Sequence, residues 1–480
     1  MTKHTGWNMA FAVFFFYAST AMLAQEQTFT TLFSFDYLDG ANPKYMSPVQ
    51  GINGHLFGTT NMGGGSGDYR PGTIFSIGVG QFQSLVTFGS SDGAYPWGGL
   101  VLGEDGTFYG TTLEGGANGY GVVFHLSSSG LDTLYSFCAQ ANCTDGADPF
   151  ATLVLGIDGN FYGTTFSGGT GNCTNAYGHG CGTVFKITAG GKLTTLHSFA
   201  GYPSDGALPI AGLVQATDGN LYGTTIFGGA FACNNPGNYD GCGTIFRISP
   251  SGELTTIHSF NSTDGAEPFD KLVQGNDGSL YGNTNAGGDI ACNPPNYGCG
   301  TVFKINSAGL TTLHVFEGGG DGCAPYAGLI QATDGNFYGT SFCGNIFQIT
   351  SSGTLTTLFT FDGGILGFPG LVQATDGNFY GTTTLGGARG YGTIYRLSTG
   401  LGPFVAFVRP AGKIGQTGGI LGQGFTGTTR VTLNGISASF RVVSDTYLTA
   451  TVPPGATTGY VTVTTPTGTL TSNTKFVVLP

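Results

Sequence analysis

The ten cysteines carry the most obvious chemistry in this 480-residue chain. They fall into five pairs of neighbours: Cys138/Cys143, Cys173/Cys181, Cys233/Cys242, Cys292/Cys299 and Cys323/Cys343. A zinc site would need C-x-x-C pairs or a cluster of histidines, and the sequence has neither. We therefore predict five local disulfides, which is typical of proteins in oxidising compartments, and no metal site.

Tyrosines recur in six loops that follow a repeated Y-G-T-T segment. They are Tyr69, Tyr120, Tyr177, Tyr239, Tyr297 and Tyr391. An aromatic face with a hydroxyl suits stacking on a sugar ring or contact with a protein partner. We predict these six as binding residues. The alternative is packing against the neighbouring repeat, which is common at repeated positions.

Aspartates recur in a second set of loops. They are Asp39, Asp92, Asp145, Asp205, Asp264, Asp321 and Asp362. A ring of carboxylates could gather a cation, but we expect these side chains to accept backbone N–H groups in turns. His197, His258 and His314 occupy one equivalent position in three repeats, so they cannot converge on a single metal or nucleophile, and we expect them to be structural.

A catalytic cluster would have to break the symmetry of the repeats. The charged residues that do so, among them Glu114, Asp148, Glu267 and Arg389, are scattered singly along the chain. No G-x-S-x-G motif or phosphate-binding loop occurs. The sequence therefore predicts no catalytic residue and no cofactor, although distant loops of a repeat fold can still bring such residues together.

Composition limits the fold and the partners. With 88 glycines, 20 prolines and 13% aromatic residues, the chain fits many short strands joined by tight turns, with a substantial core. Its net charge of −12 argues against binding to nucleic acid or to anionic lipid.

The N-terminus has the pattern of a secretory signal. Lys3 and His4 precede an apolar run from Met9 to Tyr17, and small residues follow at Ser19, Ala21 and Ala24. We predict a signal peptide over residues 1–24, cleaved after Ala21 or Ala24. The mature protein is then secreted or held at the cell surface, without membrane insertion. A retained anchor is the alternative.

An internal repeat determines the predicted fold. The motif D-G-N-F-Y-G-T-T places its second glycine at Gly58, Gly110, Gly163, Gly223, Gly282, Gly339 and Gly381. Each copy continues into G-T-[VI]-F and L-T-T-L-x-x-F segments or their variants, and D-G-A-x-P loops join the units. Four short strands per unit are typical of a β-propeller blade. Glutamines recur in the first strand, where they line the channel or satisfy one another: Gln50, Gln215, Gln274, Gln331 and Gln373.

The two ends of the array complement each other. The seventh unit stops at Gly392–Leu397 and has no following L-T-T-L strand, whereas Phe29–Phe35 supplies such a strand before the first unit. Pairing of these segments would close the array and leave no exposed edge. We therefore predict an all-β chain with a closed seven-bladed β-propeller over residues 25–400.

The units resemble the Gloeo_Verruco (GloVer) tandem repeats of bacterial exported proteins over about residues 27–397. Asp158–Thr165 and Gly182–Thr188 carry the resemblance most clearly. The sixth unit departs from it at the shortened loop Tyr338–Asn345. The resemblance implies an exported repeat protein, and no established activity comes with it.

Residues 403–480 lose the repeat and alternate threonine with valine, which predicts a compact β-sandwich. The segment resembles the IPT/TIG immunoglobulin-like family. The matching residues are Pro410, Gly422, Gly424, Phe425, Val431–Gly435, Thr451–Ala456 and Val461–Gly468. The resemblance implies a spacer or an interaction module.

The five predicted disulfides all fall in the longer loops, which a propeller gathers on one face. We therefore expect a monomeric binding or adhesion scaffold for extracellular polysaccharide or protein. Two alternatives remain open. One is an extracellular carbohydrate-active hydrolase or lyase, and the other is a purely structural component of the cell envelope.

Overall fold

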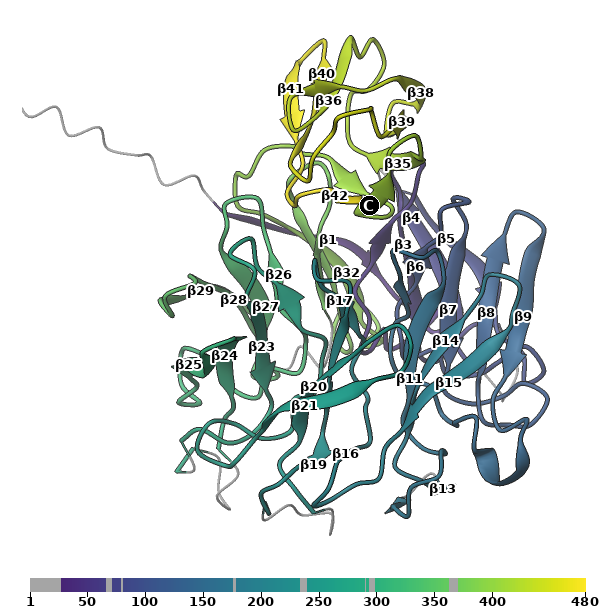
Figure 1. Ribbon diagram of the computed structural model, residues 1–480, viewed down its shortest axis with the longest axis vertical. Helices are drawn as coiled ribbons and strands as arrows, with labels where there is room; N and C mark the ends of the chain where they lie inside the picture. The colour runs from purple at the N-terminus through teal and green to yellow at the C-terminus, as the bar shows by residue number, and fades with distance from the viewer. Residues whose placement is uncertain are drawn as a thin grey trace, which may run out of the picture.

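The computed structural model describes residues 27–65, 71–78, 81–175, 178–233, 240–289, 291–292, 298–361 and 370–480. The predicted signal peptide over residues 1–24 lies outside them. Within the described residues the only helix is the short 3-10 turn η1 (Ala141–Cys143), and none is long and apolar enough to cross a membrane. The chain is otherwise built of strands (Figure 1).

Residues 28–398 contain seven four-stranded antiparallel sheets, which we number 1 to 7 along the chain. Sheets 1 to 3 are β2 (Val49–Gln50), β3 (Leu56–Thr60), β4 (Thr73–Gly78), β5 (Gln81–Thr87); β6 (Val101–Leu102), β7 (Phe108–Thr112), β8 (Val122–Ser127), β9 (Gly130–Ser136); and β10 (Val154–Leu155), β11 (Phe161–Thr165), β14 (Thr183–Ile187), β15 (Leu193–Ser198). Sheets 4 and 5 are β17 (Val214–Gln215), β18 (Leu221–Thr225), β20 (Thr244–Ile248), β21 (Leu254–Ser259); and β22 (Val273–Gln274), β23 (Leu280–Thr284), β24 (Thr301–Asn306), β25 (Gly309–Val315). Sheets 6 and 7 are β26 (Ile330–Gln331), β27 (Phe337–Thr340), β28 (Asn345–Ile349), β29 (Leu355–Thr360); and β30 (Leu371–Gln373), β31 (Phe379–Thr383), β32 (Thr393–Ser398), β1 (Thr28–Ser34).

Short two-stranded sheets lie in the connecting loops. They are β12 (Thr174–Asn175) with β13 (Gly178–His179), and β16 (Gly206–Ala207) with β19 (Phe227–Gly228). We call the end of the array that carries these loops and the D-G-A-x-P segments the loop end. The opposite end, with the Asp-Gly hairpins, is the turn end.

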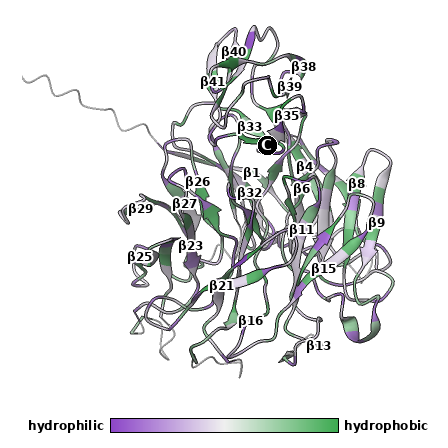
Figure 2. Ribbon diagram, in the orientation of Figure 1, coloured by the Kyte–Doolittle hydropathy of each residue, from purple (hydrophilic) through white to green (hydrophobic). Residues whose placement is uncertain are grey.

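Side-chain packing explains why the same residues recur in each repeat. In sheet 3 a side chain on Gly163 would begin 2.6 Å from the ring of Phe185 on the next strand, so only glycine fits there. The hydroxyls of Thr165 and Thr183 lie 2.8 Å apart between the same two strands. This buried contact explains why Y-G-T-T is followed by G-T-V-F. Figure 2 shows hydrophobic residues along strands such as β4, β6 and β27.

The predicted pairing of the chain's first strand with its last repeat is confirmed. β1 runs antiparallel to β32, from Thr28 opposite Ser398 to Ser34 opposite Thr393. The strand also connects sheet 7 to both its neighbours. Phe29 stacks on Phe359 of sheet 6 at a centroid distance of 4.1 Å, and Phe33 stacks on Phe82 of sheet 1 at 3.8 Å.

The repeated glutamines join adjacent sheets at the turn end. The side-chain oxygen of Gln274 accepts the N–H of Thr217 from the preceding sheet at 2.9 Å. Gln215, Gln331 and Gln373 accept equivalent bonds. Gln50 accepts the N–H of Thr375 at 2.9 Å and thereby connects sheet 7 to sheet 1. These glutamines therefore bond backbone groups of the adjacent sheet rather than one another, and Gln50 also lines the central cavity.

The C-terminal segment forms two further four-stranded sheets and one parallel pair. The sheets are β33 (Ala406–Phe407), β35 (Thr417–Leu421), β39 (Tyr447–Thr451), β38 (Phe440–Ser444); and β37 (Ile436–Ser437), β36 (Arg430–Leu433), β40 (Val461–Thr465), β41 (Gly468–Thr471). The pair is β34 (Ala411–Lys413) with β42 (Val477–Leu479). One apolar cluster that includes Val405, Phe425, Leu448 and Val463 lies between the sheets, as expected for a sandwich.

This C-terminal unit packs on the turn end (Figure 1). Buried Arg409 forms an ion pair with Glu104 of sheet 2 at 2.6 Å, and its guanidinium donates to the carbonyl of Ile157 of sheet 3 at 3.2 Å. Thr446 donates to the carbonyl of Ile52 in sheet 1 at 2.8 Å. The unit is therefore held against sheets 1, 2 and 3, and its Phe404 N–H also donates to the carbonyl of Thr375 in sheet 7 at 3.0 Å.

Candidate ligand-binding site

A central cavity of about 350 Å³ lies between the first strands of the sheets. All seven sheets contribute to it, through residues such as Val49, Val101, Val154, Leu213, Lys271, Ile330 and Val372. The C-terminal unit reaches its turn end, where Gln423 donates to the Thr375 hydroxyl at 3.0 Å. Its loop end is lined by larger side chains.

Aromatic side chains gather at the loop end of this cavity. Tyr45, Phe150, Phe269 and Tyr326 line it. The rings form two groups. Trp97 stacks on Tyr45 at 4.8 Å and meets Phe150 edge-on at 4.5 Å, while Phe269 meets Tyr326 at 4.7 Å. Tyr45, Phe269 and Tyr326 line the cavity and remain partly exposed, whereas Trp97 does not line it and supports Tyr45 and Phe150.

The D-G-A-x-P turns position these rings. In six units the residue x has a left-handed backbone, with φ between 45° and 56°: Asn42, Tyr95, Asp148, Leu208, Glu267 and Ala324. Backbone hydrogen bonds to neighbouring segments hold each turn in place. For example, the N–H of Glu267 donates to the carbonyl of Cys242 and its carbonyl accepts from Asn285. The following proline then carries the chain inward.

The sequence analysis missed this aromatic group. A signal was available, because the residue after the proline is aromatic in four units, at Trp97, Phe150, Phe269 and Tyr326. The pattern was overlooked because the tyrosines of the longer loops recur more regularly.

Sheet 5 breaks the symmetry inside the cavity. Asp270 and Lys271 line it at positions where sheet 4 has Ala211 and Gly212. The Asp270 carboxylate accepts the N–H groups of Lys271 at 2.6 Å and of Gly328 in sheet 6 at 2.7 Å. Burial raises the pKa of Asp270, and the charge of Lys271 opposes that shift. The pair gives one side of the cavity a polar, hydrogen-bonding wall.

Two left-handed positions carry buried carboxyl groups. Burial raises the pKa of Asp148 to about 6, although a hydrogen bond from the Ser167 hydroxyl opposes the shift and the nearby charge of Glu114 adds to it. Burial also raises the pKa of Glu267. The structure therefore brings Glu114 and Asp148 together, whereas Glu267 lies apart from them in another sheet's loop. The left-handed backbone recurs in all six of these turns and belongs to the architecture, whereas a desolvated acid makes Asp148 and Glu267 candidates for a functional role.

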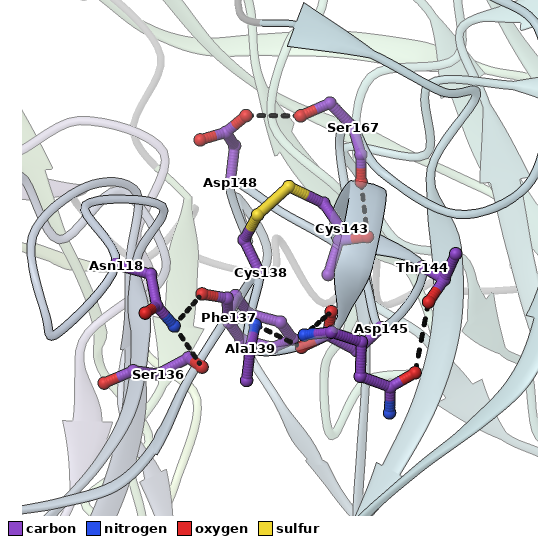
Figure 3. The surroundings of a disulfide bond; sticks show 12 residues. Asn118, Ser136, Phe137, Cys138, Ala139, Cys143, Thr144, Asp145, Asp148 and Ser167 are labelled. Atoms are coloured by element: carbon purple, nitrogen blue, oxygen red, sulfur yellow. Dashed lines mark hydrogen bonds between the residues drawn. A yellow bond between two sulfur atoms is a disulfide. The ribbon is translucent and has the colours of Figure 1, made fainter.

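All five predicted disulfides are present, at the loop end. They are Cys138–Cys143, Cys173–Cys181, Cys233–Cys242, Cys292–Cys299 and Cys323–Cys343. Figure 3 shows the first of them, with Asp148 pointing at the Ser167 hydroxyl beside it. Asp145 accepts the N–H of Ala139 at 3.0 Å within the same loop. Covalent and hydrogen bonds together fix the backbone from which the aromatic residues project.

The bridges lie in the connecting loops, as expected, and three of them also have one cysteine buried in the core. Cys181 and Cys242 are fully buried and Cys299 is only 2% exposed, and each belongs to an apolar core cluster. The reason is their place in the chain, because each stands two residues before the buried third strand of its sheet, as Cys181 does before Thr183. The Cys181 carbonyl also accepts the N–H of Leu208, the left-handed residue of the next D-G-A-x-P turn, at 2.9 Å. Cys181 and its two equivalents therefore anchor the loops to the core.

Four of the six predicted binding tyrosines, Tyr69, Tyr177, Tyr239 and Tyr297, lie outside the described residues. Tyr120 and Tyr391 are 39% and 37% exposed. Their carbonyls accept the N–H groups of Asp148 and Asn42, so their backbones support the D-G-A-x-P turns. Neither lines the central cavity. Ligand binding by these side chains stays a prediction.

The aspartates and histidines of the repeats are structural, as expected. Asp264 accepts the N–H of Asn261 at 2.9 Å and contacts the imidazole of His258 at 3.1 Å. His197 with Asp205 and His314 with Asp321 repeat this pair. Asp362 is not among the described residues. Among those that are, no three His, Cys, Asp or Glu side chains come together as potential metal ligands.

Comparisons with known proteins give a family and a fold. The sequence profile of the Gloeobacter/Verrucomicrobia repeat matches residues 15–235, 173–343 and 231–438. No curated protein matches the sequence. Among solved structures, the extracellular domain of BT3049 from B. thetaiotaomicron, described as a putative hybrid two component system, is 10% identical with a TM-score of 0.50. The match covers 95% of this chain and 58% of that one. A gluconolactonase from Xanthomonas campestris is 16% identical with a TM-score of 0.38, covering 74% and 96% of the two chains.

Proposed function

The chain belongs to the Gloeobacter/Verrucomicrobia repeat family, and from this premise we propose that it is an exported binding scaffold for extracellular polysaccharide. In this proposal the seven sheets are the blades of a closed propeller over residues 25–400. Residues 403–480 are an IPT/TIG-type domain that covers the turn end. The five disulfides support an extracellular location, because such bonds persist in oxidising compartments.

The observation that carries the proposal is the aromatic group at the loop end of the central cavity. The partly exposed rings of Tyr45, Phe269 and Tyr326 offer flat apolar faces to a sugar ring. Asp270 and Lys271 add groups that can bond hydroxyls. A largely apolar wall with a few placed polar groups is the usual composition of a small-molecule site.

The test is binding to a panel of oligosaccharides, measured by calorimetry. We expect Phe269→Ala, which removes a lining ring, and Trp97→Ala, which removes the ring that supports Tyr45, to weaken binding by at least about tenfold, because aromatic anchors dominate such sites. Tyr460→Ala, in the C-terminal unit, is the matched aromatic variant away from the cavity and should bind like the wild type. Tyr120→Ala and Tyr391→Ala test separately the prediction that these side chains bind the ligand. Unchanged binding by folded Trp97→Ala and Phe269→Ala proteins would exclude this site.

A second candidate is a carbohydrate-active hydrolase or lyase. It is favoured by Asp148, whose pKa of about 6 would let it donate a proton, and by the neighbouring carboxylate of Glu114. Release of new reducing ends from polysaccharide, abolished in Glu114→Gln and Asp148→Asn, would support this candidate. Binding without any release would exclude it.

A further inference from the structure

A second cavity, of about 730 Å³, opens between the loops of sheets 5 and 6. It is lined by Glu267, Asn285, Tyr326, Phe342 and the disulfides Cys292–Cys299 and Cys323–Cys343, among others. Tyr326 also lines the central cavity, so the two spaces share a wall. The volume falls in the range of about 300–1,000 Å³ that is typical of small-molecule sites. We call this space the side pocket.

Asn285 is the least expected residue in the side pocket. Its side chain is only 9% exposed, and its Nδ2 donates to Glu267 Oε2 at 3.3 Å. Its Oδ1 is buried and has no hydrogen-bond partner among the described residues. Sheets 2 and 3 have the apolar Leu113 and Phe166 at this position, whereas sheet 1 has Asn61, whose Nδ2 is likewise buried without a partner among the described residues and lies outside the side pocket. A buried acceptor without a partner is costly, so a ligand that donates a hydrogen bond is the expected compensation.

The neighbours of Asn285 favour an uncharged ligand. Burial raises the pKa of Glu267. Burial and then the charge of Glu267 raise the pKa of Tyr326. The walls therefore favour the protonated forms of these two groups, and the exposed carboxylate of Glu317 adds negative charge at the rim. An acidic sugar would meet this charge without any basic side chain among the described lining residues.

We infer that the side pocket is the specificity-determining subsite for a neutral sugar residue, with one hydroxyl donating to Asn285 Oδ1 and a neighbouring hydroxyl bonded to Glu267. The ring of Tyr326 or Phe342 supplies the apolar face on which the sugar lies. This inference rests on the proposed polysaccharide-binding function and extends it from the central cavity to the side pocket.

The test compares Asn285→Leu with Asn61→Leu, the same substitution at the equivalent position of sheet 1. The probes are cellohexaose, xylohexaose, maltohexaose and chitohexaose as neutral ligands and hexagalacturonate as the acidic one, all measured by calorimetry. Since leucine occurs naturally at this position in sheet 2, both variants should fold, and thermal unfolding verifies this. We expect Asn285→Leu to lower the affinity for the best neutral ligand by about tenfold or more, because the bound hydroxyl loses its acceptor and an unpaired buried polar group usually costs this much. Asn61→Leu should leave that affinity unchanged. Glu317→Gln, which removes the charge at the rim, should keep neutral binding and relax the exclusion of hexagalacturonate.

The outcomes separate this inference from the proposed function. If Trp97→Ala loses binding but Asn285→Leu keeps it within twofold of the wild type, the side-pocket inference is wrong and the binding function stands. Preference of the wild type for hexagalacturonate also overturns the inference. If the wild type binds none of the probes, both are wrong.

Discussion

At the turn end of the repeated sheets the pKa values of several carboxyl groups are lowered, whereas at the loop end those of others are raised. At the turn end, burial alone would raise the pKa of Asp158, but hydrogen bonds from Asn160 and Tyr162 outweigh it and lower that pKa. Asp218 and Asp277 show the same balance. At the loop end, burial outweighs the available hydrogen bonds and raises the pKa values of Asp148 and Glu267.

This difference separates architecture from function. A carboxylate that accepts several hydrogen bonds stabilises its turn, and the turn end repeats this arrangement from sheet to sheet. A carboxyl group buried without enough partners destabilises the fold whenever it ionises. Retention of such groups beside the aromatic cavity is expected where binding or catalysis uses them.

The turn end is regular except where the C-terminal unit packs. Sheets 2 and 3 have Leu102 and Leu155 at the position of the repeated glutamines. Leu102 shares an apolar cluster with Leu421, and Leu155 packs in a cluster with Val408. Apolar contact with the C-terminal unit thus replaces the amide bond between sheets.

The largest predicted effect tests whether the carboxyl pKa values are shifted in opposite directions at the loop end and the turn end. Because the folded pKa of Asp148, about 6, lies above the ordinary value of 3.8, the stability of the protein should fall as pH rises from about 4 to about 6. A shift of about two pKa units corresponds to about 3 kcal/mol. Asp148→Asn should therefore match the wild type at pH 4 and exceed its unfolding free energy by about 2–3 kcal/mol at pH 7. Thermal unfolding across this pH range measures it.

Asp158→Asn is the matched control at the turn end. Its folded pKa is lowered, so the stabilisation is present at neutral pH and is lost as pH falls below the ordinary range. Asp158 is exposed, and solvent screening keeps the expected loss at pH 7 below about 1 kcal/mol. If both variants shift stability in the same direction at pH 7, the contrast between the ends is wrong.

The second prediction concerns the apolar contact of the C-terminal unit. Leu155→Gln places an amide where Val408 packs, and it should weaken docking by about 2 kcal/mol. Faster proteolysis at residues 399–403, or a separate early unfolding transition, would report the released unit. Leu155→Met, which keeps the site apolar, should leave docking almost unchanged. Equal protease resistance of both variants would contradict the role given to Leu155.

The smallest effect is expected from the reverse change, Gln274→Leu. It removes the acceptor for the Thr217 N–H and should cost about 1 kcal/mol, with faster hydrogen exchange at that amide. Gln274→Glu keeps an acceptor oxygen and should protect Thr217 better than leucine does. Identical exchange in the two variants would show that this bond between sheets contributes nothing.

The sequence predicted the local features well because they depend on neighbouring residues. The cysteine pairs are only 5 to 20 residues apart, so their bridges could be expected from spacing. Pairing of β1 with β32 followed from counting repeated strands. The side-chain roles of Asp264 and His258 followed from their equivalent positions in the repeats.

The candidate site could not be found in the same way, because it consists of residues that are far apart in sequence. Trp97 and Tyr45 are brought together from two sheets, and Glu114 approaches Asp148 only through the contact between neighbouring loops. Spacing also gave the partner of Cys181 without showing that this cysteine is buried in the core. The recurrence of Tyr120 predicts a ligand contact by its side chain, and the structure adds that its carbonyl holds a turn.

The sequence by itself determined the repeated unit, the partner of each cysteine and the strand that completes the last sheet, since alternation, turn residues and spacing act over short distances. Only the tertiary structure decided which side chains face the central cavity and which acidic side chains are buried away from solvent. Those properties depend on how separate sheets pack around a common space, and no single repeat contains that information.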